Sequence, residues 1–256
     1  MDGASRTHAR GFIPPDLADA EVSLSELESS HLARVLRVRV GDRIEWFDGR
    51  GAEGEAEVLA AGKKTLRIRR LSSRRVRPPQ PEIVLLPAVL REGPMDMLLQ
   101  KAVELGVTRI QPVLAERGVV RLEAGQAESR RARWETIVLN AARQCRTAWF
   151  PRVEPPRPLA EILAEKPGFD LFLACLLADN AIPLSTALRA AAAPGVIGVA
   201  VGPEGDFSPA EEAELRRAGA TAVRLGPRVL RAETASLHVL SVLQFVFGDG
   251  APGRVP

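Results

Sequence analysis

The sequence predicts an α/β protein with two domains, in which a largely parallel sheet follows a smaller, β-rich domain. From residue 83 onward, short apolar runs alternate with helical patterns, which is typical of a parallel sheet covered by helices on both faces. Residues 12–71 show mainly strand patterns instead. A proline-rich stretch at residues 72–81 separates the two regions and is the best linker candidate. We therefore expect domains at residues 1–76 and 80–250.

The composition favours a soluble globular protein. The chain has 256 residues, of which 46% are hydrophobic and 26% are charged, as in ordinary globular domains. No apolar run approaches the ~20 residues that a membrane span needs. The stretch Met1–Pro15 has no apolar signal core, so we expect no secretion and a cytoplasmic location. Cys145 and Cys175 form neither a disulfide framework nor a metal-binding spacing, and we expect no metal.

The first domain combines strand patterns with one helix. Strands are predicted at Arg43–Phe47, Ala56–Ala60 and Thr65–Leu71, and a helix at about Leu24–Leu36. Residues 1–12 are expected to fray. A small β-barrel with one helix fits this pattern. At about 70 residues it would be marginally stable alone, so we expect it to pack on its neighbour.

Positive charge is concentrated in this first domain. Residues 1–78 hold 15 Lys and Arg against 12 Asp and Glu, whereas the remainder holds 20 of each. No acidic residue interrupts the stretch between Val58 and Pro81, which contains Lys63, Lys64, Arg67, Arg69, Arg70, Arg74, Arg75 and Arg77. Such a run can be a solvated strand face, but its density makes a nucleic-acid-binding surface at least as good an interpretation.

Strands and helices alternate through the second domain. Strands are predicted at Ile83–Leu90, Arg109–Leu114, Asp170–Leu177, Val196–Val201 and Thr221–Leu225. Helices are predicted at Met95–Leu105, Gln126–Cys145, Pro183–Ala191 and about Glu233–Phe247. One more helix is predicted between Ser208 and Gly219. Ser208 is a candidate cap for it, Pro209 suits its first turn, and Glu211 can complete a capping box.

Two glycine–proline loops follow the last two predicted strands. The first is Gly202–Ser208 and the second is Leu225–Ala235. The carboxyl ends of adjacent parallel strands are where an α/β sheet normally receives a ligand, and glycines let the backbone approach that ligand closely. Either loop alone could be a tight turn. Two loops in tandem, the second of which contains Arg228, Arg231 and Glu233, favour a ligand-binding site.

These two loops resemble the signature of a known enzyme family. The strings GPEGDFS at residues 202–208 and LGPRVLRAETA at residues 225–235 are very similar to the loops of the RsmE family. Members of that family methylate N3 of a uridine in the RNA of the small ribosomal subunit. The resemblance implies a SPOUT-type α/β-knot domain that binds S-adenosyl-L-methionine between the two loops. It also implies a homodimer.

The resemblance further implies which residues surround the cofactor and the target base. Cofactor contacts are implied for Leu176, Gly202, Pro203, Glu204, Gly205, Leu225, Gly226, Val229, Leu230 and Thr234. Uridine N3 carries a proton at neutral pH, so its methylation needs proton removal and positive groups that stabilise charge on the uracil oxygens. Arg231 is the first candidate for that stabilisation and Arg228 the second. Glu233 could accept the proton, orient Arg231 or stabilise a helix start.

The first domain also resembles the family. The string H-x-x-R-V-L-R at residues 31–37 matches its PUA-like RNA-binding domain. Phosphate contacts are then expected from Arg10, Lys63, Lys64, Arg67 and Arg69. Residues expected nearer the base are His31, Arg34 and Arg37. The implied partners are ribosomal RNA or the small ribosomal subunit.

Several positions depart from the family pattern. The pair Glu116-Arg117 matches it, but Pro94 stands where the family carries a basic residue. Arg143 likewise stands in place of an acid, and Thr147 in place of an arginine. These departures leave two alternatives open. One is a SPOUT methyltransferase that acts on another RNA or position, and the other is a non-catalytic RNA-binding factor in ribosome assembly. The two intact loops argue against the latter.

Overall fold

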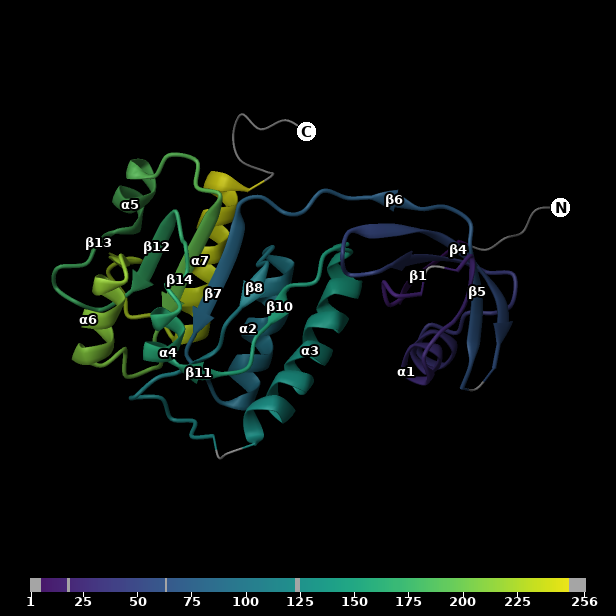
Figure 1. Ribbon diagram of the computed structural model, residues 1–256, viewed down its shortest axis with the longest axis horizontal. Helices are drawn as coiled ribbons and strands as arrows, with labels where there is room; N and C mark the ends of the chain where they lie inside the picture. The colour runs from purple at the N-terminus through teal and green to yellow at the C-terminus, as the bar shows by residue number, and fades with distance from the viewer. Residues whose placement is uncertain (1–5, 18, 63, 123–124, 249–256) are drawn as a thin grey trace. The chain divides into compact units, whose positions relative to one another are not determined.

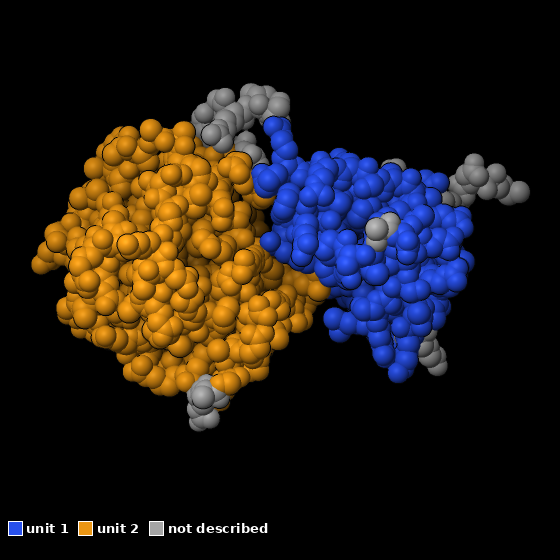
Figure 2. All heavy atoms as spheres, in the orientation of Figure 1, with its two compact units in different colours: residues 1–78, 142–150 blue, residues 79–141, 151–256 orange. Residues whose placement is uncertain are grey.

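The chain folds into two compact units. The computed structural model describes residues 6–17, 19–62, 64–122 and 125–248. The first unit comprises residues 1–78 and 142–150, and the second comprises residues 79–141 and 151–256 (Figure 2). The division near residue 78 falls within the proline-rich stretch. The sequence did not indicate that residues 142–150 belong with the first unit.

The first unit contains one six-stranded sheet. Its strands are β1 Arg6–Phe12, β2 Glu21–Ser23, β3 Arg43–Phe47, β4 Ala52–Ala61, β5 Leu66–Arg70 and β6 Arg74–Arg75. They run in the order β1-β3-β4-β5-β2, and β6 pairs with β4. Strand β1 is parallel to β3 and the other pairs are antiparallel. The expectation that residues 1–12 fray is thus wrong for residues 6–12, because β1 pairs its backbone with β3.

One helical segment packs against this sheet. Helix α1 spans Glu26–Ser30 and continues as a π-helix over His31–Val35, where the sequence predicted a single α-helix. The Ser25 side chain caps α1 by accepting a hydrogen bond from the Glu28 backbone N–H. The core of the unit is apolar and includes Leu32, Ile44, Trp46, Val58, Leu66 and Ile68. Alternation along β5 buries Leu66 and Ile68 and leaves Arg67 and Arg69 exposed.

The second unit contains a parallel seven-stranded sheet. Its strands are β7 Glu82–Pro87, β8 Arg109–Ile110, β10 Arg152–Val153, β12 Leu171–Cys175, β13 Ile182–Pro183, β14 Val196–Val201 and β15 Thr221–Arg224. Their order is β10-β8-β7-β14-β12-β15-β13. A separate two-stranded sheet pairs β9 Val113–Leu114 with β11 Arg157–Pro158. The strand predicted at Arg109–Leu114 is therefore divided between two sheets, and Pro112, which lacks a backbone N–H, lies at the division.

Helices cover both faces of the seven-stranded sheet (Figure 1). The helices of this unit are α2 Glu92–Glu104, α4 Leu159–Ala164, α5 Leu184–Ala190, α6 Pro209–Arg217, α7 Ala232–Phe247 and most of α3 Gln126–Cys145, whose last residues belong to the first unit. Helix α2 begins three residues before the predicted start, because Pro94 is tolerated in a first turn. Helix α4 was not predicted. None of the described helices is long and apolar enough to cross a membrane.

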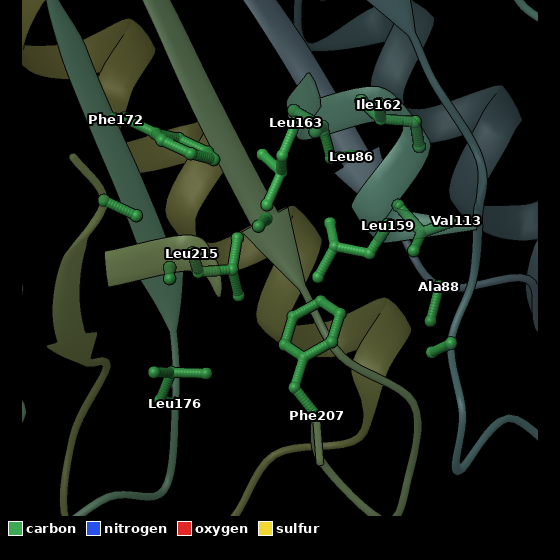
Figure 3. Packing of buried hydrophobic residues seen from close by; sticks show 14 of the residues in the cluster. Leu86, Ala88, Val113, Leu159, Ile162, Leu163, Phe172, Leu176, Phe207 and Leu215 are labelled. Atoms are coloured by element: carbon green, nitrogen blue, oxygen red, sulfur yellow. The ribbon is translucent and has the colours of Figure 1, made fainter. Parts of the chain in front are cut away.

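Two apolar layers hold these helices on the sheet. On one face, Leu159 of α4, Leu215 of α6 and the loop residue Phe207 gather against Leu86 and Phe172 of the strands (Figure 3). Helix α7 packs on the opposite face against β7, β14 and α2. The expected α/β architecture of this unit is confirmed, and it leaves the carboxyl ends of the strands open to a ligand.

Candidate functional site

The two glycine–proline loops flank a third strand end. Strand β12 lies between β14 and β15, since Cys175 is in register with Val201 of β14 and with Val223 of β15. The sequence-based expectation that β14 and β15 are adjacent is therefore wrong. Sequence patterns identify strands but do not specify their order in a sheet. The loops still meet, because the carboxyl ends of three neighbouring parallel strands lie at one edge.

A cavity opens between these three strand ends. Of the residues that the sequence suggested, Arg228 and eight of the ten cofactor candidates line it, namely Leu176, Gly202, Pro203, Glu204, Leu225, Gly226, Val229 and Leu230. Gly205, Thr234, Arg231 and Glu233 are not part of the lining. The lining residues that the sequence did not suggest are Cys175, Leu177, Val201, Asp206, Val223, Arg224, Ala232 and Ala235. Four of these eight residues, Cys175, Val201, Val223 and Arg224, lie in the last two positions of strands, a signal that could have found them.

Asp206 joins the first loop to the end of β12. One carboxylate oxygen, Oδ2, accepts a hydrogen bond of 2.8 Å from the Leu177 backbone N–H. The other, Oδ1, accepts one of 2.8 Å from the Phe207 backbone N–H. Asp206 itself has a left-handed backbone with φ of 58°, which aspartate tolerates better than most residues. The carboxylate therefore fixes two walls of the cavity relative to each other.

Arg117 and Glu211 hold the same loop from the other side. The Arg117 guanidinium donates to the backbone oxygens of Gly205 and Phe207, at 3.2 and 3.3 Å. The Glu211 carboxylate accepts from the backbone N–H groups of Glu116 and Ser208, at 2.9 and 2.8 Å. The capping box predicted for α6 is thus confirmed. The sequence pair Glu116-Arg117 therefore positions the first loop.

Glycine is required at the start of this loop. A Cβ atom added to Gly202 would lie 2.9 Å from the Phe207 backbone nitrogen, closer than real Cβ contacts allow. In the second loop, Gly226 has φ of 155°, which L-residues rarely adopt. Both loops therefore present bare backbone to the cavity. Such a surface suits a ligand that is held by backbone groups and enclosed by aliphatic side chains.

The predicted catalytic residues lie along the second loop. Arg228 is exposed and lines the cavity. Arg231 is the N-cap of α7, and Glu233 is a buried residue in the first turn of that helix. A carboxylate at this position is stabilised by the partial positive charge of the helix amino terminus. The structure thus brings Arg228 to the cavity and keeps Arg231 and Glu233 at the adjoining helix start.

Cys175 lies in the cavity wall as a neutral thiol. Burial, together with the negative charge of Asp206, raises its pKa to about 12. Since the thiolate is the nucleophilic form, Cys175 is unreactive at neutral pH. By its exposed surface Cys175 is half-buried rather than fully buried, and its raised pKa favours the interpretation from sequence that it is not a nucleophile.

The candidate RNA contacts of the first unit have different environments. Arg67 is exposed and pairs with Glu21 at 3.4 Å, and Arg69 donates to the same carboxylate at 2.9 Å. Lys64 is exposed and lies 3.1 Å from Glu26. The exposed candidates include Arg34 and Arg37. Lys63 lies outside the described residues. Arg67 and Arg69 form one face of β5, as its alternation predicts.

Arg10 differs from the other candidates because it is buried. Only 4% of its surface is exposed, and its guanidinium donates to Glu53 at 2.8 Å. Its Cζ atom also lies 4.2 Å from the centre of the Phe47 ring. The cavity that Arg10 lines offers a phosphate a route to it. This environment does not resemble that of a free surface cation.

Arg143 explains one departure from the family pattern. It forms an ion pair with Glu28, and both side chains are largely buried. Glu28 also accepts a hydrogen bond of 2.9 Å from the Phe12 backbone N–H. Burial raises the pKa of Glu28 while the Arg143 charge opposes that change. Burial, followed by the same Arg143 charge, lowers the pKa of the half-buried His31. Arg143 is therefore an internal part of the first unit.

Comparison with known families identifies the class of protein. An RNA methyltransferase domain family matches residues 77–244, and an RNA methyltransferase PUA domain family matches residues 24–69. These matches, together with the cavity at the strand ends, define an RNA methyltransferase with an amino-terminal PUA domain. The SPOUT-type α/β-knot fold with a PUA-like domain, expected from the sequence, is confirmed.

Similar proteins narrow this class to one family. Ribosomal RNA small subunit methyltransferase E of Mycobacterium bovis is 32% identical over 84% of this chain and 83% of its own length. The enzyme of that name from Synechocystis is 30% identical over 89% of this chain and 74% of its own. The chain belongs to the ribosomal RNA small subunit methyltransferase E family.

Solved structures agree with this assignment. A Neisseria gonorrhoeae ribosomal RNA small subunit methyltransferase E bound to S-adenosyl methionine is 34% identical, with a TM-score of 0.85 over 95% of this chain and 99% of its own. A Legionella pneumophila methyltransferase in complex with the same cofactor is 31% identical. Its TM-score is 0.87 over 96% of this chain and 100% of its own.

Proposed function

We propose that this chain methylates N3 of a uridine in small-subunit ribosomal RNA and uses S-adenosyl-L-methionine as the methyl donor. One observation carries the proposal: three parallel strand ends and two glycine loops enclose a cavity in a chain of this family. Since ribosomal RNA is the substrate, we place the enzyme in the cytoplasm. The intact loops disfavour a non-catalytic RNA-binding factor.

The cavity residues fit the proposed cofactor. Leu176, Leu225 and Leu230 provide aliphatic walls, and Gly202 and Gly226 expose backbone groups that can bind the polar edges of an adenosine. When bound, S-adenosyl-L-methionine supplies an electrophilic methyl group. The backbone positions that hold it are fixed by the Asp206 and Arg117 contacts. The protein therefore contributes orientation, which is a large part of the catalysis of a group transfer.

The residues of the second loop then act on the uridine. Arg231 stabilises negative charge on the uracil carbonyl oxygens as N3 loses its proton, and Arg228 assists from the cavity wall. Each pKa unit by which the site favours the uridine anion requires ~1.4 kcal/mol of differential stabilisation. Glu233 either accepts the N3 proton or orients Arg231. Its burial beside the helix start suits both roles.

Methyl incorporation tests this proposal directly. Purified small subunits and naked ribosomal RNA would each be incubated with labelled S-adenosyl-L-methionine, and the product nucleoside would be identified. We expect N3-methyluridine. Cofactor binding without that product would support a different RNA target or position. Failure to bind S-adenosyl-L-methionine would overturn the assignment of the cavity.

We also propose that the active enzyme is a homodimer. Support comes from an apolar groove of about 670 Å³ lined by α5 and α7, including Leu184, Leu188, Val242 and Phe245. Phe245 is 67% exposed and Val229, in the neighbouring loop, is 74% exposed. Apolar side chains exposed together mark interaction surfaces. A second copy of the chain, as the family resemblance implies, would cover them beside the cofactor cavity.

A further inference from the structure

A second cavity lies wholly within the first unit. It has a volume of about 490 Å³, within the ~300–1,000 Å³ typical of small-molecule sites. Strands β1, β3, β4 and β6 contribute to it, together with the two serines before β6 and the residue after α3. Its lining residues are Arg10, Glu45, Trp46, Glu53, Gly54, Glu55, Ser72, Ser73, Arg74 and Arg146. It shares no residue with the cofactor cavity.

Arg10 is the buried anchor of this cavity. Its Nη2 donates to Glu53 at 2.8 Å, and its guanidinium plane covers the Phe47 ring. Its Nε and Nη1 atoms are buried and have no hydrogen-bond partner among the described residues. Burial lowers the pKa of Arg10, while Glu53 opposes that change. Leaving buried donors unpaired is unfavourable, and such groups in native structures often mark a site of function.

The rim of the cavity carries two further arginines that can move. Arg74 lies 2.6 Å from Glu53 and Arg146 lies 2.8 Å from Glu45. Both arginines are substantially exposed, at 78% and 49% of their side-chain surfaces, so these ion pairs are weak. The lining thus contains three arginines and three glutamates. The lining therefore offers both hydrogen-bond donors and acceptors, and its positive and negative formal charges are equal in number.

We propose that this cavity binds an unpaired nucleobase of the RNA substrate, and that guanine fits it best. Guanine presents two acceptors, O6 and N7, which match a guanidinium fork. Its N1–H and 2-amino donors match a carboxylate. Arg74 and Arg146 can stack on the base plane, as arginines do in single-stranded RNA recognition. The proposal rests on RNA being the substrate.

The charge of the lining favours a base over a phosphate. A phosphate would meet Glu45, Glu53 and Glu55 together with the three arginines. A neutral base with both kinds of edge can use both sets of groups. The site is also separate from the exposed Arg67 and Arg69, which suit backbone phosphates. Arg67 and Arg69 would then position the RNA through its phosphate backbone, and the cavity would recognise one base.

Equilibrium binding of short RNAs to the full chain tests the proposal. The probe is a fluorescein-labelled uridine octamer with one central guanine, compared by anisotropy with octamers that carry inosine, adenine or uracil there. We expect the guanine octamer to bind roughly tenfold more tightly than the adenine one, within the range of a single bidentate contact. Inosine, which lacks the 2-amino group, should fall between them.

Two substitutions test whether the preference for guanine over adenine arises at this cavity. Ser73→Trp places an indole at the exposed mouth of the cavity and should reduce the guanine preference to less than twofold. Ser129→Trp adds the same bulk to an exposed position on α3 of the second unit and should leave it unchanged. Equal binding of all four octamers by the wild type would overturn the proposal. So would an undiminished preference in Ser73→Trp.

A competition experiment distinguishes a cavity that binds a nucleobase from one that binds an anion. If inorganic phosphate at constant ionic strength displaces the guanine octamer from the wild type but not from Ser73→Trp, the cavity binds phosphate and the proposal is wrong. None of these measurements requires methyl transfer. A guanine preference without methyltransferase activity would therefore contradict the proposed function alone, and activity without the preference would contradict this inference alone.

Discussion

Asp206 shows how one side chain can organise a binding site without touching the reacting atoms. Its two carboxylate oxygens accept hydrogen bonds from the Leu177 and Phe207 backbone N–H groups, so the loops after β12 and β14 share one anchor. Each N–H belongs to a loop that has no strand partner to accept it. The position of Asp206 in the left-handed region also restricts which residues can replace it.

Asp206→Ala should weaken the binding of S-adenosyl-L-methionine. Loss of the carboxylate leaves two backbone donors unpaired, and each costs about 1–3 kcal/mol if it stays buried. We expect the Kd measured by calorimetry to rise by roughly 5- to 150-fold, the equivalent of one such loss. Asp206→Asn keeps one of the two acceptors and tolerates the same backbone, so its Kd should rise less than that of the alanine variant. An unchanged Kd in the alanine variant would show that the anchor is dispensable.

Arg231→Ala should separate chemistry from cofactor binding. Arg231 lies outside the cavity lining, at the N-cap of α7, where it can face a uridine rather than the cofactor. Removing one charge-stabilising group commonly lowers kcat by ~10²–10³. We expect methyl transfer to small subunits to fall by at least that factor, with cofactor affinity within a few-fold of wild type. Loss of cofactor binding instead would make Arg231 a structural residue.

At the scale of elements, the order of strands determines the site. Strand β12 enters between β14 and β15, so its end contributes Cys175, Leu176 and Leu177 to the cavity. The two signature loops alone would form only two of the walls. In the first unit, residues of strand β5 alternate between an apolar, buried face and a basic, exposed face.

The basic face of β5 should make RNA binding dependent on salt. Each phosphate neutralised on single-stranded RNA contributes a slope of about 0.7 in log K against log salt. The double variant Arg67→Gln, Arg69→Gln should reduce the slope by roughly 1–1.5 and weaken all sequences alike. Arg217→Gln, an exposed arginine on α6, serves as control. A flat salt dependence in the wild type would contradict the RNA-binding role of this face.

At the scale of the whole molecule, two units contribute different parts of the proposed function. The second unit holds the cofactor cavity, and the first holds the basic face and the arginine–glutamate cavity. Residues 142–150 belong to the first unit although they are preceded and followed in sequence by the second. The Arg143–Glu28 ion pair and the Phe150 contacts with Phe12 and Phe47 help to fix that segment.

Phe245→Glu should convert the proposed dimer to a monomer. A carboxylate in place of an exposed aromatic ring on α7 cannot be buried at an apolar interface without a large desolvation cost. We expect light scattering after size exclusion to report twice the 27.6 kDa chain mass for the wild type and about one chain mass for the variant. Val40→Glu, at another exposed apolar side chain, controls for added charge. A monomeric wild type would overturn the homodimer.

The sequence by itself determined the elements whose signals are local. Helix α3 and strand β14 have the predicted bounds, and the Ser208–Glu211 capping box forms as the spacing required. The glycine loops were recognisable because a close backbone approach excludes a side chain at Gly202. Eight of the ten candidate cofactor residues that the family resemblance implied line the cavity.

Only the tertiary structure decided what depends on contacts between distant segments. These include the place of β12 in the sheet, the addition of β1 and residues 142–150 to the first unit, and the burial of Arg10. Residue spacing reports which face of a strand is apolar, but a strand's neighbours are selected by packing and hydrogen bonding across the whole chain. For the same reason the sequence could not tell which basic residues are exposed, as Arg67 and Arg69 are, and which are buried in a cavity wall, as Arg10 is.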